Sequence, residues 1–146
     1  MATETDKKVA LALLSEVEQQ VAEVLGNQVA MPFDVNQYDA SRDNFCEKMV
    51  KQCDLAEKKA SDDTEVLFKS YFIKAQLYGC WQKPQGVRGT HKKAVEFYDK
   101  MLQIGAEMGG DTSTIHYRYA LFCRVSPMGS KEKAKEHFKR VIELAG

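Results

Sequence analysis

Apolar residues recur every three or four positions along most of the chain, which is the spacing of one face of an α-helix. The first such segment is 4–25, and Gly26 and Asn27 end it. Its apolar face consists of Leu11, Leu14, Val17, Val21 and Val24. No segment alternates apolar and polar residues over the length of a strand, so the pattern predicts an all-α protein.

Capping and helix-breaking residues predict five further helices. The second opens at Asp34-x-x-Gln37, which has the spacing of a capping box, and it ends near the string KKAS at 58–61. A similar box, Asp62-x-x-Glu65, opens the third helix, which runs to about Trp81.

The last three helices are separated by loops that contain glycine or proline. Thr90 caps the fourth helix, and Gly109-Gly110 ends it just beyond Met108. Asp111 or Thr112 opens the fifth helix. The string SPMGS at 126–130 breaks it, and Ser130 caps a sixth helix that runs to the end of the chain.

Three of these helices carry similar strings: NFCEKMVKQC at 44–53, EFYDKMLQIG at 96–105 and EHFKRVIELA at 136–145. Their alignment superimposes Phe45, Phe97 and His137; Met49, Met101 and Val141; and Val50, Leu102 and Ile142. In each copy these positions form one apolar stripe. A single hairpin cannot bury such a stripe, whereas stacked hairpins can. We therefore expect one domain, 1–146, of three antiparallel helical hairpins at about 4–60, 63–108 and 111–145.

Small and aromatic residues in the last two hairpins occur in a pattern that resembles the tetratricopeptide repeat. The matching residues are Ala75, Tyr78, Ala94-x3-Tyr98, Ala120, Cys123 and Ala134-x3-Phe138. The string GVRGTHKK at 86–93 is also similar to the related Sel1-like repeat, which tolerates longer loops. The first hairpin departs from the pattern, with Arg42 and Cys46 in place of the alanine and the aromatic residue. The resemblance covers about 40–146 and is to a divergent member of this class.

This resemblance implies a right-handed α-solenoid whose first helices line a concave groove. Grooves of this class receive an extended peptide or a partner helix. With Ala75 and Ala120 at the small position, the groove-lining residues are Lys69, Phe72, Ile73, Gln76, Thr114, Tyr117, Arg118, Leu121 and Arg124.

The predicted groove combines aromatic and aliphatic side chains with three cations and no acid. Such a lining suits an acidic peptide with apolar anchors, because arginine offers bidentate hydrogen bonds to carboxylates. In the alternative interpretation, Phe72, Ile73 and Leu121 are core residues and the cations are merely solvated. We expect a non-catalytic scaffold or adaptor that binds another protein, whose identity the sequence does not indicate.

Charge is distributed unevenly although the net charge is zero. Residues 1–65 hold 14 acids and 7 bases, whereas 66–95 hold 6 bases and no acid. This asymmetry supports a second hypothesis from a different class, a homo-oligomer in which the acidic half of one molecule meets the basic sector of another.

A basic loop precedes the fourth helix and continues into it, with Lys83, Arg88, Lys92 and Lys93. Nucleic acid is a further alternative ligand for this loop, but only Trp81 is near enough to stack with bases, and the whole chain is not basic. Core packing and an interface contact are equally compatible with Trp81.

Residues that would indicate catalysis, a cofactor or a metal are sparse. Gly86-Val-Arg-Gly89 lacks the Gly-Lys-Ser/Thr ending of a P-loop, and the three histidines lack the spacing of metal ligands. The four cysteines form no C-x-x-C pair, and we expect buried, reduced thiols. No apolar run is long enough to span a bilayer, and the N-terminal residues do not resemble a secretion signal, so we expect a cytoplasmic protein that is not an enzyme.

Overall fold

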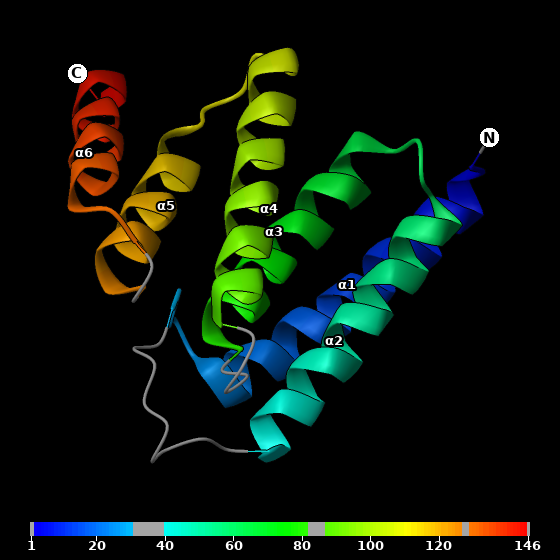
Figure 1. Ribbon diagram of the computed structural model, residues 1–146. Coiled ribbons are helices and arrows are strands. Elements are labelled where there is room, and N and C mark those ends of the chain that lie inside the picture. Colours follow the sequence, from blue (N-terminus) through cyan, green and yellow to red (C-terminus); the bar gives the residue numbers. More distant parts are fainter. Residues whose placement is uncertain (1, 31–39, 82–86, 127–128, 146) are drawn as a thin grey trace.

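The fold is all-helical, as the sequence predicts (Figure 1). The computed structural model describes residues 2–30, 40–81, 87–126 and 129–145, with the side chains of 87–89 left out. These segments contain six helices and no strand. The helices are α1 (Glu4–Leu25), α2 (Ala40–Lys59), α3 (Thr64–Cys80), α4 (Val87–Glu107), α5 (Ser113–Val125) and α6 (Lys131–Ala145).

The first helix begins at a capping box that was not predicted from the sequence. The backbone N–H of Asp6 donates to the Thr3 hydroxyl at 3.0 Å, and the Asp6 carboxylate accepts from the backbone N–H of Thr3 at 3.2 Å. The buried face of α1 is Ala10, Leu14, Val17, Val21 and Leu25. The predicted apolar stripe was therefore wrong at Val24, which is exposed, whereas Leu11 is half-buried and packs against the core.

The starts of α3 and α4 differ from the prediction. Asp63, not Asp62, caps α3, because its carboxylate accepts the backbone N–H of Val66 at 3.0 Å. Thr90 does not cap α4, since the helix already begins at Val87 and Thr90 is buried inside it. The predicted box at 34–37 lies outside the described residues.

The ends of the later helices follow the sequence more closely. Gly109 adopts a φ of 66°, its N–H donates to the Ala106 carbonyl, and the N–H of Gly110 donates to the Gly105 carbonyl. This is a Schellman motif, which ends α4 where the glycine pair predicts. Ser130 caps α6, with its hydroxyl accepting the backbone N–H of Lys133 at 3.3 Å.

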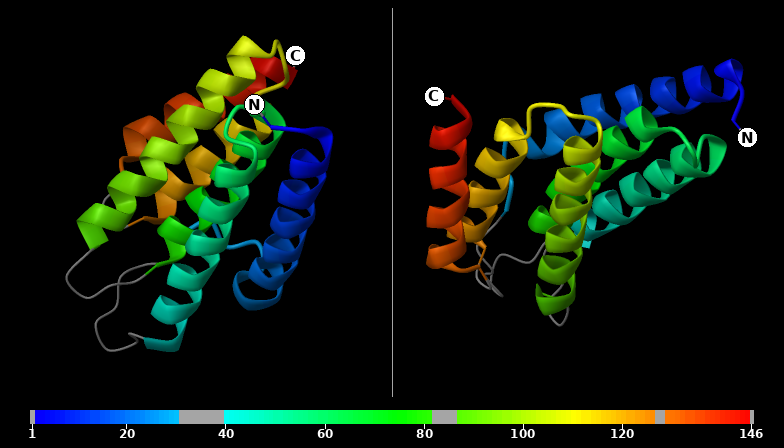
Figure 2. Two further views of the ribbon diagram at one scale, coloured as in Figure 1. Left: turned by 90° about the vertical axis from the view of Figure 1, so that its right-hand side faces the viewer. Right: turned by 90° about the horizontal axis from the view of Figure 1, so that it is seen from above.

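Consecutive helices pair as α1 with α2, α3 with α4, and α5 with α6, and the partners run in opposite directions (Figures 1 and 2). Neighbouring pairs touch through α2 and α3, α1 and α3, and α4 and α5. The helix α3 therefore lies at the centre, where it contacts α1, α2 and α4. The described ends of the chain lie at opposite sides of the molecule (Figure 1).

Among the described residues, the core consists of two clusters of buried side chains. One is formed mainly by α1, α2 and α3, the other by α3, α4, α5 and Ala134 of α6, and Tyr78 packs against both. The alanines on which the repeat resemblance rests are all buried: Ala75, Ala94, Ala120 and Ala134. The repeated apolar stripe is buried at Met49 and Met101 but not throughout α6, where Ile142 is 72% exposed.

A buried lysine joins α2 to α3. The Lys74 ammonium forms ion pairs with Asp54 and Glu57, and the Ser70 hydroxyl donates to Glu57 at 2.6 Å. Burial disfavours the charged form of Lys74, but the hydrogen bonds and charges of the two carboxylates outweigh it and raise its pKa. This polar contact fixes how α2 lies against the central helix.

Candidate functional site

An apolar cavity of about 430 Å³ lies between α1, α3 and the turn that follows α4. Phe68 and Phe72 of α3 and Met108, which directly follows α4, supply its apolar walls. Four charged residues line the same cavity: Glu18, Glu65, Lys69 and Asp111. The cavity thus combines apolar walls with charged side chains of both signs.

Helical spacing and a glycine turn explain why these residues meet. Glu65, Phe68, Lys69 and Phe72 occupy positions i, i+3, i+4 and i+7 of α3 and share one face. The opposite wall is the Schellman turn. A Cβ at Gly105 would lie only 2.7 Å from Cγ2 of Thr112, so glycine allows the chain to fold back against α4.

Phe72 separates this cavity from a smaller one of about 170 Å³. Glu18 and Phe72 line both cavities, and Arg118 of α5 lines only the smaller one. The Arg118 guanidinium lies 4.7 Å from the centre of the Phe72 ring, within the range of a cation–π contact. We refer to the two cavities, with Lys69, Phe72 and Arg118, as the Phe72 surface.

Five of the nine predicted groove residues therefore line the two cavities: Lys69, Phe72, Ile73, Gln76 and Arg118. The Lys69 ammonium donates to the Ser15 hydroxyl of α1 at 3.2 Å. Lys69 also lines the larger cavity, so its positive charge lies near that cavity. Phe72 is half-buried, so part of its ring faces the surface.

Two further predicted residues on α3 are buried. Ile73 is 2% exposed and belongs to the core cluster of α1, α2 and α3, so the core interpretation holds for it. The Gln76 amide donates to the backbone carbonyls of Gly26 at 3.0 Å and Gln28 at 2.7 Å. These residues hold α1 and the segment after it against α3, and both also line the smaller cavity.

The remaining predicted residues lie on the outer face of α5. Thr114, Tyr117 and Arg124 are exposed, and Leu121 is half-buried. The Arg124 guanidinium lies 5.8 Å from the Phe138 ring centre, and the Tyr117 ring meets Phe138 edge-on at 6.2 Å. Arg124 and Tyr117 therefore contact α6. Among the described residues of α5, only Arg118 lines either of the two cavities.

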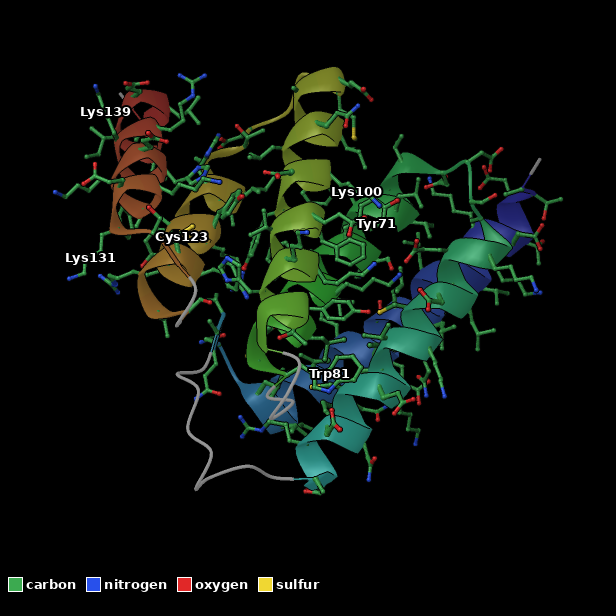
Figure 3. The ribbon with its side chains drawn as sticks, viewed as in Figure 1. Tyr71, Trp81, Lys100, Cys123, Lys131 and Lys139 are labelled. Carbon is green, nitrogen blue, oxygen red and sulfur yellow. The ribbon has the colours of Figure 1, made fainter. Side chains whose placement is uncertain are left out.

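The predicted basic loop is only partly described. Lys83 lies outside the described residues, and Arg88 is placed only as backbone in α4. Lys92 and Lys93 are exposed, and the Lys93 ammonium lies 3.6 Å from a Glu96 carboxylate oxygen. Trp81 is 6% exposed and stacks on Tyr78, so its ring belongs to the core (Figure 3).

A histidine pair between α5 and α6 went unnoticed in the sequence because its members are far apart in the chain. The Nδ1 atoms of His116 and His137 lie 2.9 Å apart, and the Tyr119 ring stacks on His137 with ring centres 4.1 Å apart. Burial lowers the pKa of both imidazoles. Within the described segments, no group of three or more His, Cys, Asp or Glu residues could hold a metal ion.

All four thiols are buried, as predicted. Burial raises the pKa of Cys46, Cys53 and Cys80 to about 12 and also raises that of Cys123. A thiol with such a pKa is almost entirely protonated at neutral pH, and the thiolate is the nucleophilic form. These cysteines therefore act as packing residues.

Comparison with known proteins adds no assignment. No protein-family model, curated protein or solved structure matches the chain. None of the helices in the described segments is both long and apolar enough to cross a membrane.

Proposed function

We propose that the chain is a non-catalytic interaction module that binds a peptide or helix of another protein on the Phe72 surface. The observation that carries this proposal is the pair of cavities on either side of Phe72, with Arg118 stacked on its ring. The larger cavity, of about 430 Å³ with apolar walls, has the size and character of a typical binding site.

The architecture that we propose for this module is a divergent, tetratricopeptide-like right-handed solenoid. Three antiparallel helix pairs, each touching the next, are compatible with it. The buried alanines at the repeat positions, Ala75, Ala94, Ala120 and Ala134, also support it, since small residues let paired helices approach closely.

The lining of the cavities defines the chemistry of the partner. A bulky apolar side chain would fill the larger cavity against Phe68, Phe72 and Met108. An acidic residue beside that anchor would pair with Arg118, since a guanidinium stacked on a ring keeps its donors in one plane. Glu18, Glu65 and Asp111 line the larger cavity, so acidity is favoured beside the anchor and not along the whole peptide.

Selection from a random peptide library tests this proposal. We expect the selected peptides to share a bulky apolar residue close to an aspartate or glutamate. Arg118→Glu should weaken their binding at least about tenfold, in the range of a lost charged contact. Met108→Lys should do the same by placing a charge at the cavity, and Met108 is 58% exposed, so the change spares the core.

Arg124→Glu is the matched control, because it makes the same charge change on the same helix but away from the cavities. Its binding should stay within about twofold of the unmodified protein. Circular dichroism melting establishes that each variant is folded. The proposal would be refuted if the folded Arg118→Glu and Met108→Lys variants bound the selected peptides as tightly as the unmodified protein does.

A further inference from the structure

The outer face of α6 carries a row of lysines. Lys131, Lys135 and Lys139 follow one another at intervals of four residues, and Ile142 continues the same face. All four are exposed, and Lys131 and Lys139 point away from α5 (Figure 3). Within the described segments none of the three lysines forms an ion pair. This basic and apolar strip, the α6 strip, is therefore free to bind.

The first helix carries a strip of the opposite charge. Val9, Ala12, Glu16 and Glu23 lie at i, i+3, i+7 and i+14 of α1, and all of them are exposed. Val9 is a large apolar residue that is 45% exposed. Neither Glu16 nor Glu23 takes part in an ion pair in the described part of the chain. We refer to these four residues as the α1 strip.

The helix contacts within the molecule indicate how the two strips would meet. The second helix of a pair touches the first helix of the next pair, as α2 touches α3 and α4 touches α5. In this register Val50 of α2 is buried and Leu102 of α4 is half-buried, whereas the equivalent Ile142 of α6 is 72% exposed. An α1 helix from elsewhere would complete the series.

We propose that the α6 strip of one molecule binds the α1 strip of a second copy, head to tail. The lysines would pair with Glu16 and Glu23, and Ile142 would be buried next to Val9. Charge complementarity between the strips selects a second copy as the occupant. The contact is heterologous, so an assembly of any length keeps a free α6 strip at one end and a free α1 strip at the other, and it grows with concentration.

Analytical ultracentrifugation of the full chain tests this proposal over a wide range of protein concentration, at about 20 mM and about 500 mM salt. We expect the average mass to rise with concentration at low salt and to fall toward the monomer at high salt, where exposed charges are screened. A monomer at every concentration in low salt would overturn the proposal. So would a dimer that is insensitive to salt.

Charge-reversal variants identify the two surfaces. Lys135→Glu/Lys139→Glu makes both strips acidic, and Glu16→Lys/Glu23→Lys makes both basic, so each variant alone should associate at least about tenfold more weakly. An equimolar mixture should associate again, because the acidic α6 strip of one variant fits the basic α1 strip of the other. A mixture that stays monomeric would contradict the pairing of these strips.

The matched control is Lys92→Glu/Lys93→Glu. It changes the net charge by the same amount as the α6 variant, but on exposed residues of α4. It should associate like the unmodified protein, and a loss equal to that of the α6 variant would mean that net charge alone drives association. Since none of these variants alters the Phe72 surface, peptide binding and self-association can fail independently.

Discussion

Gly79 lies where α3 approaches the segment that follows α1. A Cβ at this position would lie 2.1 Å from the carbonyl oxygen of Val29 and 3.3 Å from Cδ1 of Phe122. The first of these neighbours is backbone, which cannot rotate out of the way. The close approach of these three segments therefore depends on one missing methyl group.

Gly79→Ala should lower the free energy of unfolding by about 2 kcal/mol or more, as expected for overpacking against backbone. Urea unfolding followed by circular dichroism measures this change. Gly110→Ala is the control, because the nearest atom to its added Cβ would be 3.9 Å away. That control should change stability by less than about 0.5 kcal/mol. Equal stability of the Gly79→Ala variant and the unmodified protein would contradict the contact.

The histidine pair makes a residue-scale prediction about pH. The groups facing it are Tyr119 of α5, Asp99 of α4, and Lys133, Glu136 and Arg140 of α6. Burial lowers the pKa of both imidazoles in the folded state, so the unfolded chain binds more protons below about pH 6.5. The stabilisation from the neutral pair is complete above that pH and is lost as the pH falls toward the lower, folded-state pKa values.

The free energy of unfolding should therefore decrease between about pH 6.5 and 5, each histidine contributing at most about 1.4 kcal/mol per pH unit. Urea titrations at several pH values measure this slope. His116→Gln/His137→Gln should reduce the slope without abolishing it, because His91 is also shifted downward by burial. An unchanged slope in the double variant would show that the pair does not titrate in this range.

At the scale of single helices, the start of α3 distinguishes two neighbouring aspartates. Asp63 accepts the Val66 N–H and lies 3.3 Å from the Lys7 ammonium, whereas Asp62 is exposed. Asp63→Ala should cost about 1 kcal/mol of stability through the lost cap. Asp62→Ala should cost less than about 0.5 kcal/mol. Thermal melting of the two variants measures the difference, and the reverse order would contradict the cap.

Helix number and helix ends could largely be predicted from the sequence, because glycine pairs, proline and serine act locally. The Gly109-Gly110 end of α4 depends only on nearby backbone, and so does the Ser130 cap at the start of α6, which was also predicted correctly. The starts of α3 and α4 were harder to predict. Asp62 and Asp63 are both good capping residues, so local preference alone could not show which of them caps α3. Thr90 is tolerated at a cap and also inside a helix, so local preference could not show where α4 begins.

The faces of the helices were predicted less well than their extents. Helical spacing placed Lys69, Phe72, Ile73 and Gln76 on one side of α3, but it could not show that α1 and the segment after it cover two of them. Likewise, the repeat register placed Ile142 in a buried stripe, although no described helix covers it. A single sequence gives the period of a helix but not its neighbours.

At the scale of the whole molecule, stability should fall from the centre toward α6. Helix α3 is buried by three neighbours, whereas α6 pairs with α5 and buries little besides Ala134. Backbone amides exchange through local opening, which is easier where few side chains are buried. Hydrogen exchange measured by mass spectrometry on the dilute protein in high salt should be fastest in α6 and slowest in α3. Protection of α6 equal to that of α3 under these conditions would contradict this order.

The candidate site as a whole could not be predicted from the sequence. Its walls come from α1, α3 and the turn at 108–111, and Glu18, Met108 and Asp111 show no pattern that links them to Phe72. The charge sectors were visible in the sequence, but their effect depends on which faces are exposed. The acid-free basic region of the sequence, 66–95, includes the buried Lys74, whereas the exposed row of lysines lies on α6.

Trp81 has a practical consequence for all these measurements. It is the single tryptophan of the chain, and it stacks on Tyr78, whose ring centre is 5.4 Å away and which packs against both core clusters. Its emission should therefore shift to longer wavelength when the junction between the clusters opens. Trp81 is therefore an intrinsic fluorescence probe at the junction between the two core clusters, and unfolding can be followed without attaching a dye.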